Sequence, residues 1–419
     1  MKKTLLLLAM VTLAHGATRA GGFKIGLQGQ RQIGMAHTGI GLAQDAATVY
    51  FNPAGMAFVG NQLSVGVSGI IPRIQFLDAN TNQRTDAVNQ LFTPFSLYAT
   101  CQIKNTPLQF GLGVYTPFGS GVEYPTDWSG RYVLTSINLT NVFIQPTISW
   151  RLNDYLSVGG GFVYSLGHVD LNRQIPLNSI GEKEASGNLE GNAQGLGYNL
   201  GVYFKPNKRL SLGATYHSRV DMKVDNGTAT FTNIPEAAEA SFPNTAFTTS
   251  LPLPGELGIG GAYRLSKKVT VALDLNYTFW NSFKSLGFDY RDNTDQLTDE
   301  ASPRNYENAY AARAGLQWEA GNRSTVRAGL FYDQTPVQDA FVNPELPDND
   351  KAGVSIGYTY WLKDRLSLDV SLLYEDVAKR LTLNTETKLH GTYRTKVMIP
   401  GVGINYLFNK RVKRRVPFK

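Results

Sequence analysis

The side chains that most often carry out catalysis or hold metal ions are few in this chain and far apart in its sequence. The five histidines are His15, His37, His168, His217 and His390. No strand-to-helix elbow that would expose a nucleophilic serine is evident, and no group of His, Cys, Asp or Glu has the spacing of a metal site. We therefore expect no enzymatic activity, no bound metal and no cofactor.

Three arginines lie on the polar side of segments in which polar and apolar residues alternate, at Arg219, Arg313 and Arg327. A guanidinium in such a position can hold the carboxylate head group of a ligand. It can equally form an ion pair with an acidic residue of the protein, and Asp369 lies on the same polar side. Both interpretations stay open for each arginine.

The formal net charge of +7 is concentrated at the two ends of the chain. Residues 1–20 carry three positive charges and residues 409–419 carry six, so the body between them has a net charge of −2. This distribution provides no basic surface for nucleic acid. The single cysteine, Cys101, excludes an internal disulfide and is interpreted as a small strand residue.

The first twenty residues have the order of charge and hydrophobicity of a signal peptide. Two lysines precede the apolar run 4–13, and Thr18 and Ala20 are small residues at the −3 and −1 positions of a cleavage site. The mature chain is then expected to start at Gly21. No later segment has the roughly 20 consecutive apolar residues of a membrane-spanning helix.

From about residue 61 onward, segments of about ten residues alternate between apolar and polar side chains, for example residues 310–318, 366–374 and 402–408. This alternation predicts strands with one apolar and one polar face. The predicted short turns lie near 104–106, 153–154, 206–208, 266–267, 320–322 and 363–364. The predicted long connections lie near 73–91, 117–139, 172–194, 225–251, 284–306, 335–350 and 381–392.

Short turns thus alternate with long connections, which indicates an up-and-down antiparallel β-barrel of about 14 strands in a bacterial outer membrane. Aromatic residues near turns or strand ends are consistent with the aromatic girdles of such barrels. They are Trp150, Trp280, Trp318, Trp361, Tyr406 and Phe408. A soluble β-sandwich also alternates, but it has no reason to place short turns at one end and long loops at the other.

Residues 21–59 precede the first predicted strand, are rich in glycine and are partly apolar. A barrel of about 14 strands has a lumen too wide for wall side chains alone to fill. We therefore expect this segment to fold inside the lumen as a hatch, with the barrel formed by residues 60–408.

Several motifs in order along the chain resemble those of the FadL-type outer-membrane transporters of long-chain fatty acids and other hydrophobic compounds. They are Gly22-Phe23, residues 45–55 with Asn52-Pro53-Ala54-Gly55, residues 115–119 (YTPFG), residues 128–132 (WSGRY), Leu251-Pro252, residues 277–280 (YTFW), residues 327–329 (RAG) and Thr335-Pro336. The resemblance covers almost the whole chain after the signal peptide. It implies a 14-stranded barrel, capture of ligand at outer loops, an apolar lumen pocket and lateral release into the bilayer at a kinked third strand.

The third predicted strand contains Gly111 and Gly113. Glycine inside a strand weakens pairing and often marks a bulge or bend. The resemblance places the lateral opening at this strand, so we expect the kink at these two glycines. The alternative is that they only make room for the hatch.

Within the hatch, Asn52-Pro53-Ala54-Gly55 is expected to end a short helix and turn the chain toward the wall, since proline fixes φ and asparagine bonds local backbone. A direct ligand contact of this motif is the alternative. Phe23 and Ile25 are expected to reach into the lumen and line the pocket, unless the mature N-terminus is disordered.

The connections near 172–194 and 225–251 are unusually apolar for exposed loops, and residues 235–240 read as a short helix that begins with proline and glutamate. Exposed apolar patches usually bind something. We expect a capture groove here, with loop-on-loop packing as the alternative. Its residues would be Ile175, Leu177, Ile180, Phe231, Ile234, Phe242 and Phe247.

Long-chain fatty acids are the first ligand hypothesis, and monoaromatic or other small hydrophobic molecules are the alternative. A general porin and a loop-based receptor or adhesin are rivals of other classes. The expected partners are a hydrophobic small molecule, outer-membrane lipid and the barrel-assembly machinery, and we expect a monomer that binds no nucleic acid. Phe408 ends the last predicted strand, and residues 409–419 form a basic tail beyond it.

Overall fold

The computed structural model describes residues 21–177 and 184–409. The predicted signal peptide, Ile180 and almost all of the predicted basic tail lie outside these described residues. Within them, no helix has the length and apolar character needed to cross a membrane.

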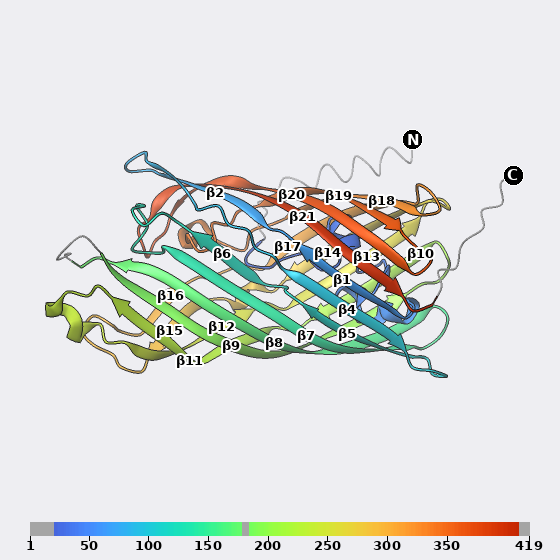
Figure 1. The fold of residues 1–419 in the computed structure, drawn as a ribbon, viewed down its shortest axis with the longest axis horizontal. Helices are drawn as coiled ribbons and strands as arrows, with labels where there is room; N and C mark the ends of the chain where they lie inside the picture. The colour runs from blue at the N-terminus through green and yellow to red at the C-terminus, as the bar shows by residue number, and fades with distance from the viewer. Residues whose placement is uncertain (1–20, 178–183, 410–419) are drawn as a thin grey trace.

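Fourteen strands in the described part of the chain form a closed antiparallel barrel, as predicted (Figure 1). Each pairs with the next, and the first pairs with the last, Gln62 opposite Leu407, to close the ring. The barrel strands are β1 (Gln62–Ser68), β4 (Phe95–Gln102), β5 (Leu108–Tyr115), β7 (Ser136–Arg151), β8 (Leu156–Ile175), β9 (Ala185–Phe204), β10 (Leu210–His217), β13 (Glu256–Arg264), β14 (Val269–Thr278), β17 (Ala309–Trp318), β18 (Ser324–Asp333), β19 (Lys351–Trp361), β20 (Leu366–Leu383) and β21 (His390–Leu407).

Further strands extend the wall at the end of the barrel that carries the long connections. They are β2 (Ile71–Asp78), β3 (Arg84–Asp86), β6 (Gly119–Glu123), β11 (Val220–Thr232), β12 (Thr245–Leu253), β15 (Ser285–Tyr290) and β16 (Glu300–Pro303). The helical turns are α2 (Gln30–Ile33), α3 (Thr48–Phe51), η1 (Pro53–Phe58), η2 (Glu236–Ser241), η3 (Trp280–Ser282) and η4 (Asp339–Phe341).

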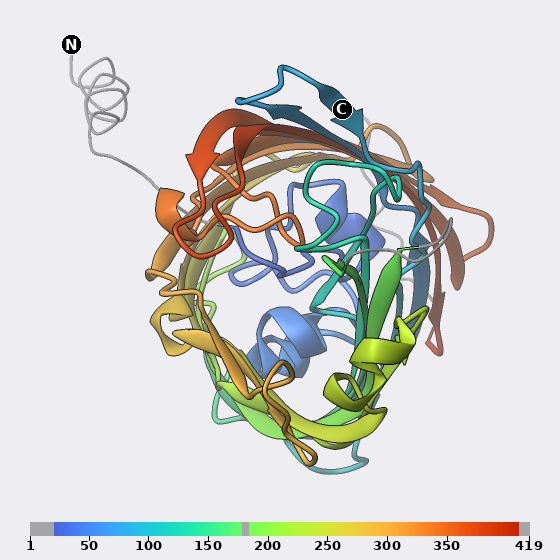
Figure 2. The same cartoon turned by 90° about the vertical axis from the view of Figure 1, so that its left-hand side faces the viewer.

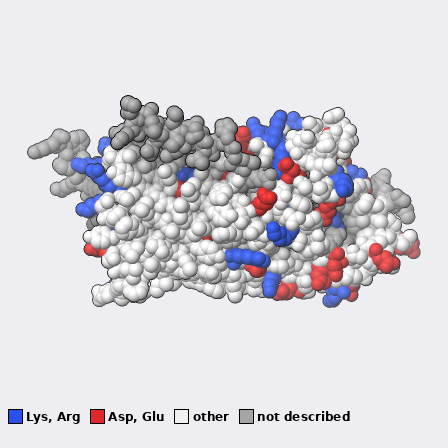
Figure 3. Space-filling view, turned by 180° about the vertical axis from the view of Figure 1, so that it is seen from behind, with Lys and Arg blue, Asp and Glu red and all other residues white. Residues whose placement is uncertain are grey.

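The wall has apolar side chains outside and polar side chains inside. In β19, Val354 and Ile356 are 60% and 56% exposed on the outer surface, whereas Ser355 and Thr359 between and after them are buried toward the lumen. Seen from behind, the wall carries a broad uncharged band, and charged side chains gather toward the ends (Figure 3). This is the sidedness of a barrel whose outer surface faces lipid.

The six short turns lie where they were predicted, but the long connections were predicted too long. Strands β8 and β9 continue pairing to Ile175 and Ala185, and β11 and β12 occupy most of the predicted loop 225–251. Where a strand extends beyond the lipid at the long-connection end, its outer face meets water and need not be apolar. The alternation therefore fades there although the hydrogen-bonded ladder continues.

The predicted aromatic girdle is only partly correct. Trp150, Trp318 and Phe408 are about half exposed on the outer wall, at 51%, 45% and 51%, and Tyr406 is 37% exposed there. Trp280 and Trp361 are buried instead. Trp280 packs inside the lumen, and the Trp361 ring lies 5.5 Å from the Arg31 guanidinium. A strand-end position does not distinguish an inward ring from an outward one.

Residues 21–59 lie inside the ring of strands (Figure 2). Their contacts reach opposite parts of the wall: α2 touches β19, β20 and β21, whereas η1 touches β5, β7, β8 and β9. The residues are mostly buried, and several polar groups among them bond to the wall, for example Gln30 Nε2 to Ser68 Oγ at 3.0 Å and Gly39 N to Asp274 Oδ2 at 2.7 Å.

Near the long-connection end, the wall ladder is interrupted between β2 and β6. Strand β5 pairs with β4 up to Tyr115 opposite Ser96, and β6 then pairs only with β7. On the other side of the gap, β2 pairs with β21. No strand ladder joins β2 to β6 in the described structure, and the segment 87–94 spans the space between them through single backbone contacts.

Candidate ligand-binding cavities

The Asn52-Pro53-Ala54-Gly55 motif connects α3 to η1 deep in the lumen. The Asn52 side chain is fully buried, accepts a hydrogen bond from Ala54 N at 3.1 Å, and donates to Ile40 O at 3.2 Å and Val202 O at 3.1 Å. It thus joins two parts of the N-terminal segment to strand β9. None of the four motif residues lines the cavities described below.

Two glycines of the barrel wall, Gly159 and Gly201, lie directly against this motif. A Cβ on Gly201 would lie 2.3 Å from Asn52 Oδ1, and one on Gly159 would lie 2.6 Å from the Pro53 carbonyl carbon. Neither distance is possible for a real side chain, so the backbone of the segment approaches the wall only because glycine is there.

The kink predicted at Gly111 and Gly113 is not there. Both residues pair in regular register with β4 on one side and β7 on the other. A Cβ on Gly111 would lie 2.5 Å from Met56 Sδ. Gly111 therefore makes room for the N-terminal segment, which was the alternative interpretation. The strand breaks three residues later, at Thr116-Pro117-Phe118, because proline cannot donate to a ladder.

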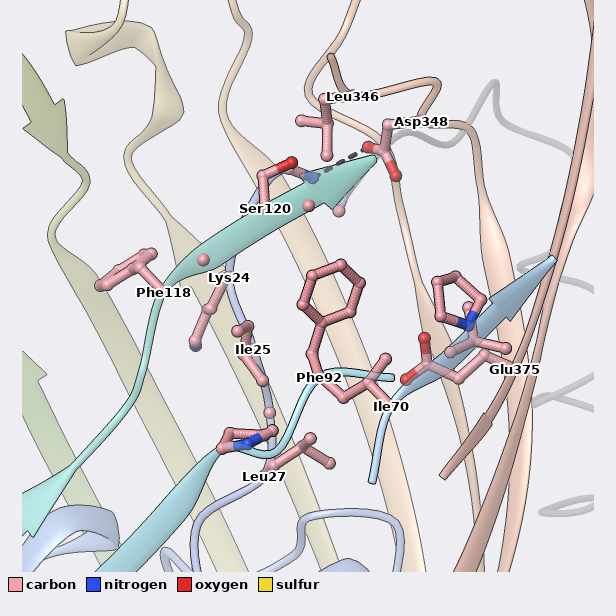
Figure 4. A pocket seen from close by; sticks show the side chains of 18 of the residues that line it. Lys24, Ile25, Leu27, Ile70, Phe92, Phe118, Ser120, Leu346, Asp348 and Glu375 are labelled. Atoms are coloured by element: carbon pink, nitrogen blue, oxygen red, sulfur yellow. Dashed lines mark hydrogen bonds between the residues drawn. The ribbon is translucent and has the colours of Figure 1, made fainter. Parts of the chain in front are cut away.

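A cavity of about 570 Å³, here called the outer cavity, lies above the N-terminal segment next to this interruption (Figure 4). Its apolar wall comes from β2, β6 and the segment between them and includes Ile70, Leu91, Phe92, Phe95 and Val122. Leu91 and Phe95 also reach the outside, where they are 63% and 44% exposed. The outer cavity therefore borders the lipid-facing surface where the ladder is missing.

The N-terminus is docked onto the broken strand. Ile25 N donates to Pro117 O at 2.8 Å, and Gly119 N donates to Phe23 O at 3.0 Å. These are backbone groups that an unbroken β5–β6 strand would have used in its own ladder. The strand break thus creates the edge to which residues 23–25 bind.

The opposite wall of the outer cavity is charged. Lys24 Nζ contacts the Glu256 carboxylate, Arg313 Nη2 lies 2.9 Å from Asp333 Oδ1, and Lys351 and Glu375 are close by in the lining. Arg313 Nη1 is buried without a hydrogen-bond partner in the described structure. The cavity is consequently amphipathic, with an apolar side at the wall interruption and charged groups of both signs across from it.

Burial acts on the ionisable groups of the N-terminal segment. For Lys24, burial alone would lower the pKa, but the nearby Glu256 carboxylate outweighs it and the pKa lies above its ordinary value. Burial, with help from Arg313, Lys24 and Lys351, holds the pKa of His37 well below 6.5. Histidine 37 therefore lines the cavity as a neutral imidazole at neutral pH.

A second space of about 90 Å³, the side cavity, lies beyond Phe23 toward the long connections. Its lining is almost wholly apolar and includes Leu251, Leu253, Phe283 and Phe288. Phe23 borders the side cavity, and its neighbours Lys24 and Ile25 border the outer cavity. The Phe23 ring packs 4.9 Å from Trp280 and 5.8 Å from Phe283. The two predicted N-terminal residues thus lie at the two cavities.

The predicted capture residues are only partly brought together. Phe231 and Phe242 pack together with ring centroids 5.6 Å apart, beside the helical turn η2 that the sequence predicted. Phe247 is buried against Phe288 and Tyr290, and Ile175 is buried at the end of β8. Leu177 and Ile234 are partly exposed, and none of the six described residues lines either cavity.

The three arginines have three different environments. Arg219 is about half exposed and pairs with Asp221, so it does not face the lumen. Arg313 lines the outer cavity, as described. Arg327 is buried near the short-turn end of the lumen and bonds to Gln317, Gln44 and Thr359.

Sequence reasoning missed the strand break and the Lys24–Glu256 pair. Proline 117 inside a strand pattern was the available signal for the break, because β-ladders exclude proline. No sequence signal joins Lys24 to Glu256, which lie 232 positions apart. Among the residues described, no group of His, Cys, Asp or Glu is arranged to hold a metal ion.

Comparisons with known proteins give a consistent picture. The family model described as "Outer membrane protein transport protein (OMPP1/FadL/TodX)" matches residues 11–408. A long-chain fatty acid transport protein of Escherichia coli O6:H1 is 24% identical, with 97% of this chain and 98% of the relative covered.

Two solved structures share the fold. A Pseudomonas aeruginosa FadL homologue superimposes with a TM-score of 0.79 at 19% identity and covers 93% of this chain and 100% of its own. The Ralstonia pickettii toluene transporter TbuX superimposes with a TM-score of 0.70 at 16% identity and covers 91% of this chain and 98% of its own.

Proposed function

Because the chain belongs to the OMPP1/FadL/TodX family of outer-membrane transport proteins, we propose that it carries hydrophobic compounds from outside the cell into the outer membrane. The observation that carries this proposal is the position of the outer cavity. The cavity lies inside the barrel, has an apolar wall, and borders the place where no strand ladder joins β2 to β6 in the described structure.

The energetics favour such a route for an apolar ligand. Each methylene moved from water into an apolar environment gains about 0.8 kcal/mol. A ligand that passes from the outer cavity sideways into lipid keeps its methylenes buried. A ligand that passes through the lumen to the periplasm would lose this gain and would also have to displace residues 21–59.

Long-chain fatty acids are the first ligand class. The amphipathic outer cavity suits a molecule with an apolar chain and a polar head, because Arg313 Nη1 is a buried donor without a partner in the described residues. The Escherichia coli relative named for long-chain fatty acid transport supports the same class. The head group would lie near Arg313 and the chain would lie along Ile70, Phe92 and Val122.

Small aromatic hydrocarbons are the second candidate. The side cavity is small, almost wholly apolar and bordered by several aromatic rings, among them Phe23, Phe118 and Phe283. The structural similarity to the Ralstonia pickettii toluene transporter is compatible with this class but rests on the fold. A ligand of this kind needs no polar partner.

The proposed sequence of events has three steps. Apolar residues at the outer end, such as Phe231 and Phe242, collect the ligand. The ligand then enters the outer cavity past Phe23, while the N-terminal segment keeps the lumen closed beneath it. It leaves between β2 and β6, where segment 87–94 is the only described chain that would have to move.

The cavity is tested by filling it. Ala311 on β17 is 8% exposed and lines the outer cavity, whereas its neighbour Ala312 points to the outside. We expect Ala311→Trp to weaken binding of a fluorescent fatty acid at least tenfold and Ala312→Trp to leave it unchanged. Equal binding by the two variants would place the ligand elsewhere. Competition by toluene then distinguishes the two ligand classes.

A further inference from the structure

A third cavity, of about 260 Å³, lies at the short-turn end of the lumen and is here called the basic pocket. Its walls come from the ends of β10, β13, β14, β17 and β18, and residues 42–44 of the N-terminal segment form its inner side. Short turns face the periplasm in outer-membrane barrels. The basic pocket is therefore the inner mouth of the lumen, on the far side of the N-terminal segment from the outer cavity.

Positive charge dominates this pocket. Its lining contains six basic side chains and one carboxylate, Glu319. The six are Arg31, Lys205, Lys208, Arg209, Arg264 and Arg327. The Arg31 guanidinium is already neutralised, since its Nε lies 3.2 Å from Asp369 Oδ2 and 3.7 Å from Asp45 Oδ2. Even with Glu319 set against one of them, Lys208, Arg209 and Arg327 leave an excess of positive charge in the lining.

Arg327 is the centre of this excess. It is 4% exposed, yet its hydrogen-bond partners are neutral: Gln317 Oε1 at 2.9 Å, Gln44 Oε1 at 3.3 Å and Thr359 Oγ1 at 2.5 Å. Thr359 in turn donates to Asp369, the carboxylate that pairs with Arg31. Arg31 and Arg327 thus share the Asp369 carboxylate. Arg31 contacts it directly, whereas Arg327 is linked to it only through the Thr359 hydroxyl.

A buried guanidinium without its own counter-ion destabilises the folded protein, and a nearby second cation increases this cost. The cost is removed when an anion enters the adjacent cavity. We propose that the basic pocket binds a phosphate-type oxyanion, held by Arg327 and the surrounding basic side chains. Guanidinium groups suit this ligand because their planar fork matches two oxygens of a phosphate.

The same oxyanion would connect the N-terminal segment to the wall. Gln44 of the segment already contacts Arg327 of β18, and Arg31 of α2 borders the same cavity. An anion among these groups would stabilise the closed lumen from the periplasmic side. The phosphate group can come from free inorganic phosphate or from the head group of a lipid at the inner mouth, and the chemistry of recognition is the same.

The test measures unfolding of the purified full-length mature protein in a neutral detergent. The midpoint of thermal unfolding is followed while inorganic phosphate replaces chloride at constant ionic strength. We expect a saturable rise of the midpoint by about a few degrees, because a ligand of the native state stabilises it by mass action. Chloride at the same ionic strength is the reference. A rise of the midpoint that does not saturate with phosphate concentration would overturn the proposal.

Two variants locate the site. In Arg327→Gln we expect the apparent phosphate affinity to fall at least tenfold. Because this variant can fail to fold, Lys208→Gln/Arg209→Gln at the exposed rim is a second probe, with an expected fall of several-fold. Arg219→Gln, at the other end of the barrel and paired with Asp221, is the matched control and should respond like the unaltered protein. Unchanged affinity in a folded pocket variant would overturn the assignment.

Parallel titrations with glycerol phosphate and with short-chain phosphatidylglycerol distinguish the two sources. A response to both supports a site for soluble phosphate groups. A response to the lipid alone, lost in Arg327→Gln, supports a head-group site. Absence of any response to these ligands and to inorganic phosphate would refute the oxyanion site.

Discussion

The outer cavity and the basic pocket lie at opposite ends of one lumen, separated by the N-terminal segment, and their linings have opposite chemistry. The outer cavity joins an apolar wall to a charged side on which Glu256, Asp333, Asp348 and Glu375 outnumber the cations. The basic pocket has little apolar surface and six cations. A hydrophobic molecule in the outer cavity therefore finds no continuous apolar path toward the periplasm, which favours a sideways exit.

The largest expected effect comes from fixing segment 87–94 to the wall. Ile70 and Phe92 exchange two backbone hydrogen bonds, of 2.7 and 3.1 Å, and such opposed residues have the spacing that a disulfide needs. We expect Ile70→Cys/Phe92→Cys, in a Cys101→Ser background, to abolish uptake of a labelled fatty acid when oxidised. Reduction of the same protein should restore uptake and serves as the control. Full uptake in the oxidised state would mean that ligand leaves by the inner mouth. The different linings of the outer cavity and the basic pocket would then not determine the exit route.

A smaller effect is expected from Asn52, which anchors the segment between the two cavities. Asn52→Ala removes the side-chain hydrogen bonds to Ile40 O, Val202 O and Ala54 N, at a cost of about 1–3 kcal/mol for each group that stays unsatisfied. We expect a lower midpoint in thermal unfolding and ion leakage through the lumen in planar bilayers, with ligand affinity at the outer cavity retained. Asn52→Asp keeps the bond from Ala54 N, so its unfolding midpoint should lie between those of the unaltered protein and Asn52→Ala. If Asn52→Ala instead lost ligand affinity and kept normal stability, we would conclude that this motif contacts the ligand.

The smallest expected effect is a dependence of protein stability on pH. It comes from His37, which lines the outer cavity. The pKa of His37 lies well below 6.5 in the folded protein, so the unfolded chain binds the proton first as pH falls. The free energy of unfolding is then highest above pH 6.5 and decreases below it, by at most about 1.4 kcal/mol per pH unit. His37→Asn should remove this decrease and still tolerate the backbone, since φ is 66° and asparagine accepts that region. Thermal unfolding between pH 4 and 8 measures it, with exposed His168→Asn as the control, and an unchanged profile in His37→Asn would contradict the assignment.

Sequence patterns predicted the barrel well because lipid imposes a simple rule. Each spanning strand must expose apolar residues at every second position, so β17, β20 and β21 were visible as alternating runs, and the turns between strands followed. Above the lipid this rule lapses, and the extents of β8, β9, β11 and β12 were missed for that reason.

The candidate site was predicted in part. Phe23 and Ile25 lie at cavities, and the resemblance to a transporter family indicated the third strand. The position of its interruption was misplaced at Gly111 and Gly113, because glycine serves both a bend and a close approach and the sequence does not separate these uses. The basic pocket was not predicted, since its residues come from the N-terminal segment and from the ends of several strands and meet only when the ring closes.

The closed ring also sets an order of events in the making of the protein. Arg31 bonds to Asp369, which lies 338 positions later, and α2 packs against β19, β20 and β21, the last strands to be synthesised. The wall partners of α2 are therefore incomplete until the final strand has been added. Contacts of such long sequence separation form late and slowly. Helix α2, which precedes every wall strand in the chain, therefore acquires its wall contacts among the last of this molecule.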